Sequence, residues 1–225
     1  MSTLHSTVQP WLAHSQQRAL DMWNEFETDV NRGASPGSSP LLTPASLLDP
    51  SKGSAPNAAV EGLFRFSARK HRNVEIAALQ PGDLHQQSRN RKVGRAAAWL
   101  AVFPNRRKKL DVYIILDWNY LTIQYGRGVA DMVRAVNHLV LHETGHVVLH
   151  WQKLTSAGGV PPQGLVQDMD PQAEAEAWGF CGALLSMALA RIAYETKANP
   201  TPSSRQAWEY LFPHPKEHYH QPLPS

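Results

Sequence analysis

The pentapeptide HETGH, residues 142–146, constrains this chain more than any other feature of its sequence. It matches the pattern H-E-x-x-H and lies in the apolar run HLVLHETGHVVLH, which predicts a helix over residues 129–151. Residues four apart share one face of a helix, so His142 and His146 can present two imidazoles to one metal ion. Glu143 stands beside them as the candidate general base for a metal-activated water. The segment therefore predicts a zinc-binding helix.

A catalytic zinc site needs a third protein ligand, and the sequence offers three candidates. His150 continues the four-residue spacing, but at about 1.5 Å per residue it lies roughly 12 Å along the helix axis from His142, too far to share one ion. Glu174 and Glu176 lie on a second helix, which we expect over residues 172–195. Residues two apart point about 200° away from each other around a helix, so only one of these carboxylates can face the metal. These patterns leave the choice between the two glutamates open, and a plain surface glutamate near a helix N-terminus is the alternative for either of them.

Gly145 lies inside the expected metal-binding helix, where a glycine costs about 1 kcal/mol relative to alanine. Close passage of another backbone segment beside this helix would account for it. A neutral, tolerated glycine is the alternative, and the sequence does not choose between the two.

Length and composition suit one moderate domain with extensions. The chain has 225 residues, of which 42% are apolar, enough to build a core. Its single cysteine, Cys181, excludes an intrachain disulfide and suits a reducing compartment. Residues 1–17 lack the basic and apolar regions of a secretory signal, and no apolar run approaches the roughly 20 residues of a membrane span. We therefore expect an intracellular, cytoplasmic protein with no membrane partner.

Four segments follow one another along the chain. Residues 1–30 form an N-terminal arm, with one amphipathic helix over residues 10–30. Residues 31–59 contain five Pro, six Ser and three Gly, a composition that predicts a disordered linker. Residues 60–197 form the metal-binding domain, and residues 198–225 form a C-terminal tail.

The domain mixes strand and helix patterns, so we expect the α+β class. Residues 110–116, LDVYIIL, are rich in β-branched and aromatic residues and predict a strand. Residues 93–103 are apolar enough to be buried, as helix or strand. Short elements, whose type is open for the first, are expected around residues 62–66 and 74–79.

The two expected helices together resemble the ImmA/IrrE-type metallopeptidases. That family has an H-E-x-G-H-x-x-x-H helix, followed by a helix with the pattern E-x-x-A-x-x-F-A-x-x-L-L. The run LVLHETGHVVLH matches the first part. The second part falls on Glu174, Ala177, Phe180, Cys181, Leu184 and Leu185. The resemblance covers about residues 110–188, and more weakly residues 60–109, and it maps the third metal ligand to Glu174. Thr144 and Cys181 replace residues usual in the family, and Ser186-Met187 stands where the second motif commonly closes with Met-Pro.

This resemblance implies a gluzincin-like fold and a zinc-dependent peptidase that hydrolyses a peptide bond in a protein substrate. Zinc held by His142, His146 and Glu174 would polarise a bound water. Glu143 would take the proton as that water attacks the scissile carbonyl. The family often cleaves a transcriptional regulator, so such a regulator is an expected substrate. Attack on the carbonyl creates an oxyanion, which needs a hydrogen-bond donor besides zinc. The candidates are Tyr120, Tyr125, His138 and His150.

A basic block spans residues 65–109, with 12 Lys and Arg against only Glu75 and Asp83. Residues 110–225 are mildly acidic, with 11 Asp and Glu against seven Lys and Arg. A cationic surface attracts nucleic acid or an acidic protein, although solvated loops and helix faces are the simpler explanation of the block. The alternative to a peptidase is therefore a non-catalytic regulatory protein that uses the same metal-binding fold to hold a protein or nucleic acid.

Overall fold

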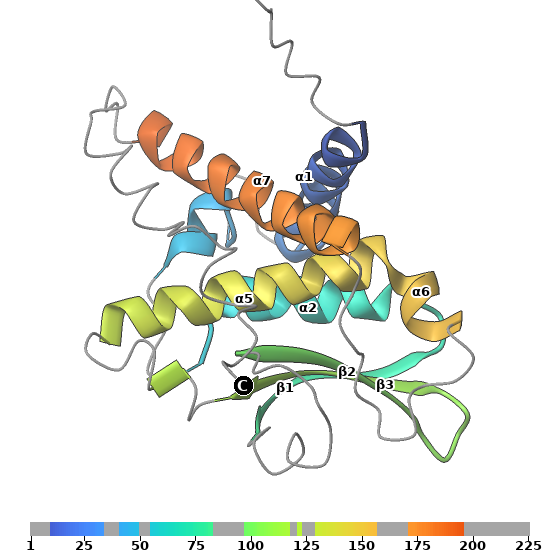
Figure 1. Cartoon of the computed structure of the whole chain (residues 1–225). Helices are drawn as coiled ribbons and strands as arrows, with labels where there is room; N and C mark the ends of the chain where they lie inside the picture. Colours follow the sequence, from blue (N-terminus) through green and yellow to red (C-terminus); the bar gives the residue numbers. More distant parts are fainter. Residues whose placement is uncertain are drawn as a thin grey trace, which may run out of the picture.

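The computed structural model describes residues 10–33, 41–49, 55–82, 97–117, 121–122, 129–156 and 171–195. They form an α+β fold in three layers, which confirms the expected class (Figure 1). A three-stranded sheet is the first layer. Helices α2 (Ala58–Arg69) and α5 (Val129–Leu149) cover one face of the sheet, and helices α1 (Pro10–Asn31) and α7 (Pro171–Glu195) lie over them. The helices expected over residues 10–30, 129–151 and 172–195 are thus present as α1, α5 and α7.

The sheet has the strand order β1-β3-β2. Its strands are β1 (Val74–Gly82), β2 (Ala98–Pro104) and β3 (Leu110–Asp117). The central strand β3 pairs parallel with β1 and antiparallel with β2. The strand predicted over residues 110–116 is confirmed as β3, and the segment left open between helix and strand contributes β2. The short element expected around residues 62–66 is part of helix α2, and the one expected around residues 74–79 is strand β1.

Side chains alternate across the sheet with the period of two that a pleated strand imposes. On β2 and β3 the helix-facing residues of the main core are Ala98, Leu100, Val102, Val112, Ile114 and Leu116. The opposite face carries a smaller buried cluster of Trp99, Ala101 and Ile115. Both faces of the central strand are therefore apolar, which is why LDVYIIL is a nearly continuous apolar run.

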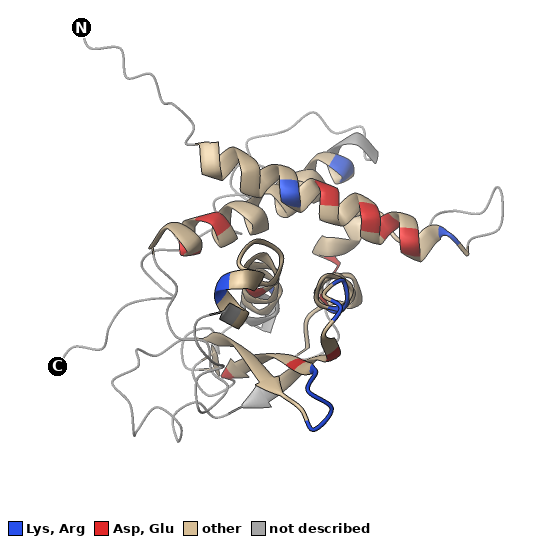
Figure 2. Cartoon of the chain, turned by 90° about the vertical axis from the view of Figure 1, so that its right-hand side faces the viewer, with Lys and Arg blue, Asp and Glu red and all other residues tan. Residues whose placement is uncertain are grey.

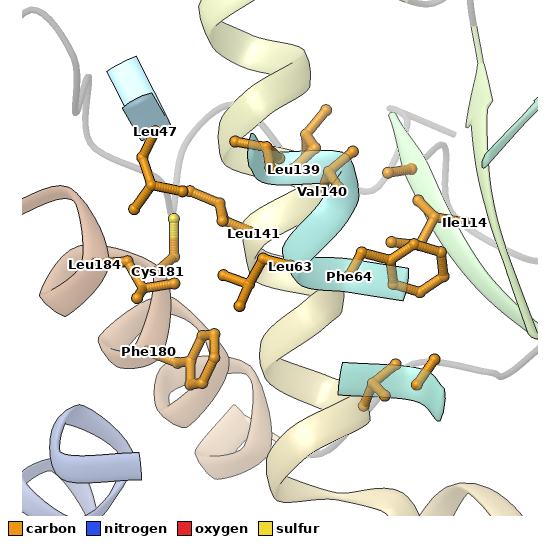
Figure 3. Close-up of a cluster of buried hydrophobic side chains, with 14 of the residues drawn as sticks. Leu47, Leu63, Phe64, Ile114, Leu139, Val140, Leu141, Phe180, Cys181 and Leu184 are labelled. Carbon is orange, nitrogen blue, oxygen red and sulfur yellow. The ribbon is translucent and has the colours of Figure 1, made fainter. Parts of the chain in front are cut away.

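The main core joins all three layers, as Figure 3 shows. Its fully buried side chains include Leu63 and Phe64 on α2, Leu141 on α5, and Phe180 on α7. Full burial of one such side chain stabilises the fold by about 1.5–3 kcal/mol. The helices that carry the metal-binding motif are thus held by the same core as the sheet.

The N-terminal helix α1 packs on α7 and belongs to this core. Trp23 is fully buried, and Phe26 is 6% exposed. The two rings meet edge to face, with centroids 5.8 Å apart. Phe26 also lies against Gly62 of α2, so α1 bridges two other helices.

Part of the segment 31–59 is ordered, so the prediction of a disordered linker is wrong for residues 31–33, 41–49 and 55–59. The 3₁₀ helix η1 (Pro44–Leu48) packs on α7 and buries Leu47 completely. Residues 34–40 and 50–54 lie outside the described residues.

Two asparagines explain how a Pro- and Ser-rich segment can pack. The Asn31 side chain donates to the Leu42 carbonyl at 2.9 Å and accepts from the Leu42 amide at 3.1 Å. The Asn57 side chain caps α2 at the Val60 amide and donates to the carbonyl oxygens of Leu47 and Asp49. Backbone polar groups are therefore paired by specific side chains, which composition does not reveal.

Among the described helices, only α7 has the length and the apolar composition that a membrane-spanning helix needs. A core helix of a soluble protein meets the same test, and α7 packs against α1, α5 and η1. Phe180 and Leu184 on this helix are fully buried. The fold is therefore compatible with a soluble protein.

Candidate metal centre

Helix α5 carries both histidines of the motif on the side that faces α7. His142 is 3% exposed and His146 is 4% exposed. Their Nε2 atoms lie 3.1 Å apart. The spacing of four residues thus brings both imidazoles to one point, as the sequence predicts.

Glu174, in the first turn of α7, completes the cluster. Its Oε2 lies 3.2 Å from Nε2 of His142, and its Oε1 lies 3.4 Å from Nε2 of His146. Two ligand atoms held at 2.0–2.1 Å from a tetrahedral ion are roughly 3.3 Å from each other. The three measured separations, including the 3.1 Å between the histidines, match this value. These residues could therefore hold a metal ion, and they are the one such group among the described residues.

Glu176 takes a different partner. Its Oε2 lies 2.7 Å from Nε2 of His150. His150 is 4% exposed and follows the last residue of α5, and its Nδ1 lies 3.1 Å from Nδ1 of His146. The structure therefore brings Glu174 to the two motif histidines, and brings Glu176 and His150 to the outer side of His146.

The pKa values of this outer pair are both lowered. Burial lowers the pKa of His150 and outweighs the hydrogen bond to Glu176, so the imidazole is neutral at pH 7. For Glu176, burial raises the pKa, but hydrogen bonds from His150 and Gln172 outweigh it, and the net pKa is lowered. A carboxylate therefore faces a neutral imidazole.

Gly145 permits the close approach of the two helices that this cluster requires. A Cβ at this position would lie 3.1 Å from both Cα and O of Ala177, and 3.3 Å from Cβ of Phe180. Such contacts are tighter than normal packing, so any larger residue would push α7 away. Of the two explanations that the sequence left open, close passage of another backbone segment is the one that the structure bears out.

One face of α7 sets the direction of the Glu174 side chain. This face carries Glu174, Ala177, Trp178 and Cys181, which follow one another at the spacings of three and four residues that place side chains on one face of an α-helix. Trp178 lies over His142, with ring centroids 4.2 Å apart. Cys181 donates from its thiol to the His138 carbonyl, with Sγ 3.6 Å from the oxygen. These contacts set the rotation of α7 about its own axis, and with it the direction of the Glu174 side chain.

Two residues near the site were not recognised from the sequence. The signal for Trp178 was available, because Trp178 follows Glu174 by four residues and so shares its face of α7. The other is His71, whose Nε2 lies 3.1 Å from the Val147 carbonyl and whose ring stacks on Trp151 at 4.0 Å. The contacts of His71 span distant parts of the chain, so no local pattern announces them.

Glu143, the candidate general base, follows His142 on α5 and is 8% exposed. Of the residues considered as oxyanion donors, Tyr120 and Tyr125 lie outside the described residues. His138 is 6% exposed, and burial together with the charge of Arg134 lowers its pKa to about 4. His138 is therefore neutral at pH 7.

Two turns of the basic block lie together at one end of the sheet. The turn between β2 and β3 exposes Arg106–Lys109, the blue loop in Figure 2. The side-chain oxygen of Asn105 accepts from the backbone amides of Arg107 and Lys109, which fixes this turn. The preceding turn, which exposes Arg72, lies at the same end, since the Leu110 amide donates to the Asn73 carbonyl at 2.7 Å. Residues 83–96, which carry the rest of the basic block, and the C-terminal tail lie outside the described residues.

Comparisons with protein-family models, with curated proteins and with solved structures find no match to this chain. Its function must therefore be inferred from the chemistry of the site itself.

Proposed function

We propose that this protein is an intracellular zinc-dependent peptidase of the ImmA/IrrE type, with a gluzincin-like fold. The observation that carries the proposal is the cluster of His142, His146 and Glu174. The distances between its ligand atoms match those between ligands of a tetrahedral ion. Two imidazole nitrogens and one carboxylate oxygen are the ligand set of many catalytic zinc sites, and they leave a fourth position for water. The substrate class we propose is protein, with a transcriptional regulator as the specific candidate.

The resemblance to the family also has a physical reason in this chain. The small residue Ala177 of the second motif packs against Gly145 of the first. Four residues further along, Cys181 packs against the backbone of His138. These contacts hold α5 and α7 at the distance at which Glu174 meets the histidines.

Bound zinc would supply a Lewis acid that lowers the pKa of water toward neutrality. His142 and His146 would hold the ion through their imidazole nitrogens, and Glu174 would hold it through its carboxylate. Glu143 accepts the proton of the attacking water and passes it to the departing amine, so the peptide bond breaks with no net proton change at the enzyme. The Trp178 ring lies over the His142 ring and so helps to fix its orientation.

A peptide library with a mass-spectrometric readout tests this proposal without knowledge of the substrate. The zinc-loaded protein is expected to produce new peptide ends, and the zinc-loaded Glu143→Gln variant is expected to produce none. Equal cleavage by the variant would remove Glu143 from the mechanism. A zinc-loaded wild type without any cleavage would instead favour the non-catalytic alternative.

The second candidate function is the binding of nucleic acid without cleavage. The basic turn Arg106–Lys109 favours it, because four consecutive exposed cations, of which Arg107 pairs with Glu75 at 2.6 Å, lie on a turn that Asn105 holds in shape. Cations on a fixed turn attract a phosphate backbone and release its counterions. This function and the peptidase depend on different residues, so each can fail alone.

A further inference from the structure

A chain of three side chains leads outward from the metal centre. Nδ1 of His146 lies 3.1 Å from Nδ1 of His150. Nε2 of His150 lies 2.7 Å from Oε2 of Glu176. Both histidines are buried, at 4% exposure each, so the contacts are shielded from competing water.

The direction of both hydrogen bonds between these three side chains follows from the role of one nitrogen, Nε2 of His146. Nε2 of His146 faces His142 and Glu174, so it must be unprotonated to bind a metal ion. The proton of a neutral His146 is then on Nδ1, and Nδ1 donates to Nδ1 of His150. Since that atom accepts, the proton of His150 is on Nε2 and points to the carboxylate of Glu176. All three residues satisfy one another with a single assignment of protons.

We propose that His150 and Glu176 are positioning residues of the metal centre, which form a carboxylate–histidine–histidine relay that fixes the tautomer and ring orientation of His146. The inference rests on the proposed metal site but does not need peptide hydrolysis. A partner of this kind on the outer nitrogen orients a metal-bound histidine and raises its basicity. Here the partner is itself a histidine, and the carboxylate acts through it.

The relay also connects two separate segments of the fold to the metal ligand His146. His150 lies between α5 and α6 (Trp151–Ser156), whereas Glu176 is on α7, two residues after Glu174. Gln172 donates to the other oxygen of Glu176 at 2.8 Å, through an exposed hydrogen bond that is not part of the relay. A purely structural contact between α6 and α7 would use the same bonds, but it would not affect the affinity for metal once the protein is folded.

The test measures the zinc dissociation constant by competition with a chromophoric chelator. The variants are Glu176→Ala, Glu176→Gln and His150→Gln, with Gln172→Ala as the matched control, since it removes the exposed hydrogen bond to Glu176 and leaves the relay intact. Loss of such a partner typically weakens metal binding by about 10–100-fold. We expect this range for Glu176→Ala, a smaller loss for Glu176→Gln, whose amide oxygen still accepts a hydrogen bond, and a change below about threefold for Gln172→Ala.

Two further readouts separate positioning from folding. Urea unfolding of the metal-free variants shows whether the domain remains folded, and the absorption of bound Co²⁺ reports the geometry of the ligands. The relay predicts a changed Co²⁺ spectrum in Glu176→Ala, with partial return in Glu176→Gln. Nitrogen NMR of the imidazoles should place the proton of His150 on Nε2 in the zinc-loaded protein.

Zinc affinities of the Glu176 and His150 variants within threefold of the wild type would overturn the relay while leaving the metal site in place. A proton on Nδ1 of His150 would also overturn it. If the wild type binds no zinc at all, the proposed metal site fails, and the relay fails with it.

Discussion

The Cβ that Gly145 lacks would lie 3.1 Å from the backbone of Ala177. This contact sets the distance between α5 and α7, and Glu174 stands on α7 three residues before Ala177. The separation of the two helices therefore determines whether Glu174 can reach the two histidines.

Replacement of this glycine should weaken metal binding. In Gly145→Ala the gain in helix propensity, about 1 kcal/mol, is opposed by overpacking against a backbone that must move, which typically costs about 1–3 kcal/mol. We expect a zinc dissociation constant raised by at least tenfold and no gain in stability. The matched control is Gly182→Ala on α7, where a Cβ would meet nothing within 4 Å. That variant should keep its zinc affinity and gain up to about 1 kcal/mol in the free energy of unfolding; equal behaviour of both variants would contradict the packing role of Gly145.

Removal of the candidate general base should separate chemistry from metal binding. Glu143→Gln keeps the shape of the side chain but cannot accept the proton, so kcat should fall by about 10²–10⁴-fold with zinc content unchanged. Glu174→Gln should instead lose zinc and activity together. Once a cleaved peptide is identified, its hydrolysis rate and the metal content of both variants check this pair of outcomes. Substantial activity in Glu143→Gln would assign the proton transfer elsewhere.

The stability of the metal-free protein should fall as the pH falls from 6.5 toward 4. The pKa of His138 is lowered to about 4 in the fold, from an unfolded value of 6.5, because burial and Arg134 disfavour its charged form. Between these values the unfolded chain binds a proton that the folded chain does not, so unfolding is favoured. The contribution of this one group amounts to about 2 kcal/mol by pH 5.

Urea unfolding at pH 7.5 and pH 5, with a chelator present, measures this loss. The loss should be smaller in His138→Gln than in the wild type by about 2 kcal/mol, since glutamine does not titrate. His71 and His150, whose pKa values burial also lowers, act in both proteins and cancel from the comparison. An equal loss in both proteins would show that His138 does not titrate as its burial requires.

The basic turn should bind duplex DNA in a salt-dependent manner if the second candidate function holds. Replacement of Arg106–Lys109 by four alanines should weaken binding and flatten its salt dependence, by about 0.9 in the logarithmic slope for each phosphate that the variant no longer neutralises. Arg32→Gln, on the exposed segment after α1, serves as the control and should have little effect. Fluorescence anisotropy at several salt concentrations checks both. Binding that is absent, or that salt does not affect, would leave the turn as a solvated loop.

Local patterns predicted the parts of this protein that depend on one helix or one strand. The spacing of His142 and His146 and the β-branched run of β3 are of this kind, because each follows from the period of a single element. The choice of Glu174 over Glu176 came from the family resemblance, and the structure agrees that Glu174 is the one near the histidines. The helical period alone could not decide between Glu174 and Glu176, since it shows only that the two carboxylates cannot both face the metal.

Other features depend on contacts between distant residues and had no local signal. The order of residues 41–49 depends on Asn31 and on a pocket for Leu47 that α7 helps to form. The partnership of His150 with Glu176 joins residues 26 positions apart. Composition records neither contact, which is why the sequence predicted a disordered linker and did not predict the partner of His150.

The most direct test of the central claim is the zinc content of the purified protein by elemental analysis, for the wild type beside His142→Ala, Glu174→Ala and Glu176→Ala. We expect about one zinc per wild-type chain, lost in His142→Ala and Glu174→Ala and retained in Glu176→Ala when zinc is in excess. A wild type that holds no stoichiometric zinc after reloading, or a Glu174→Ala variant that keeps it, would contradict the proposed metal centre.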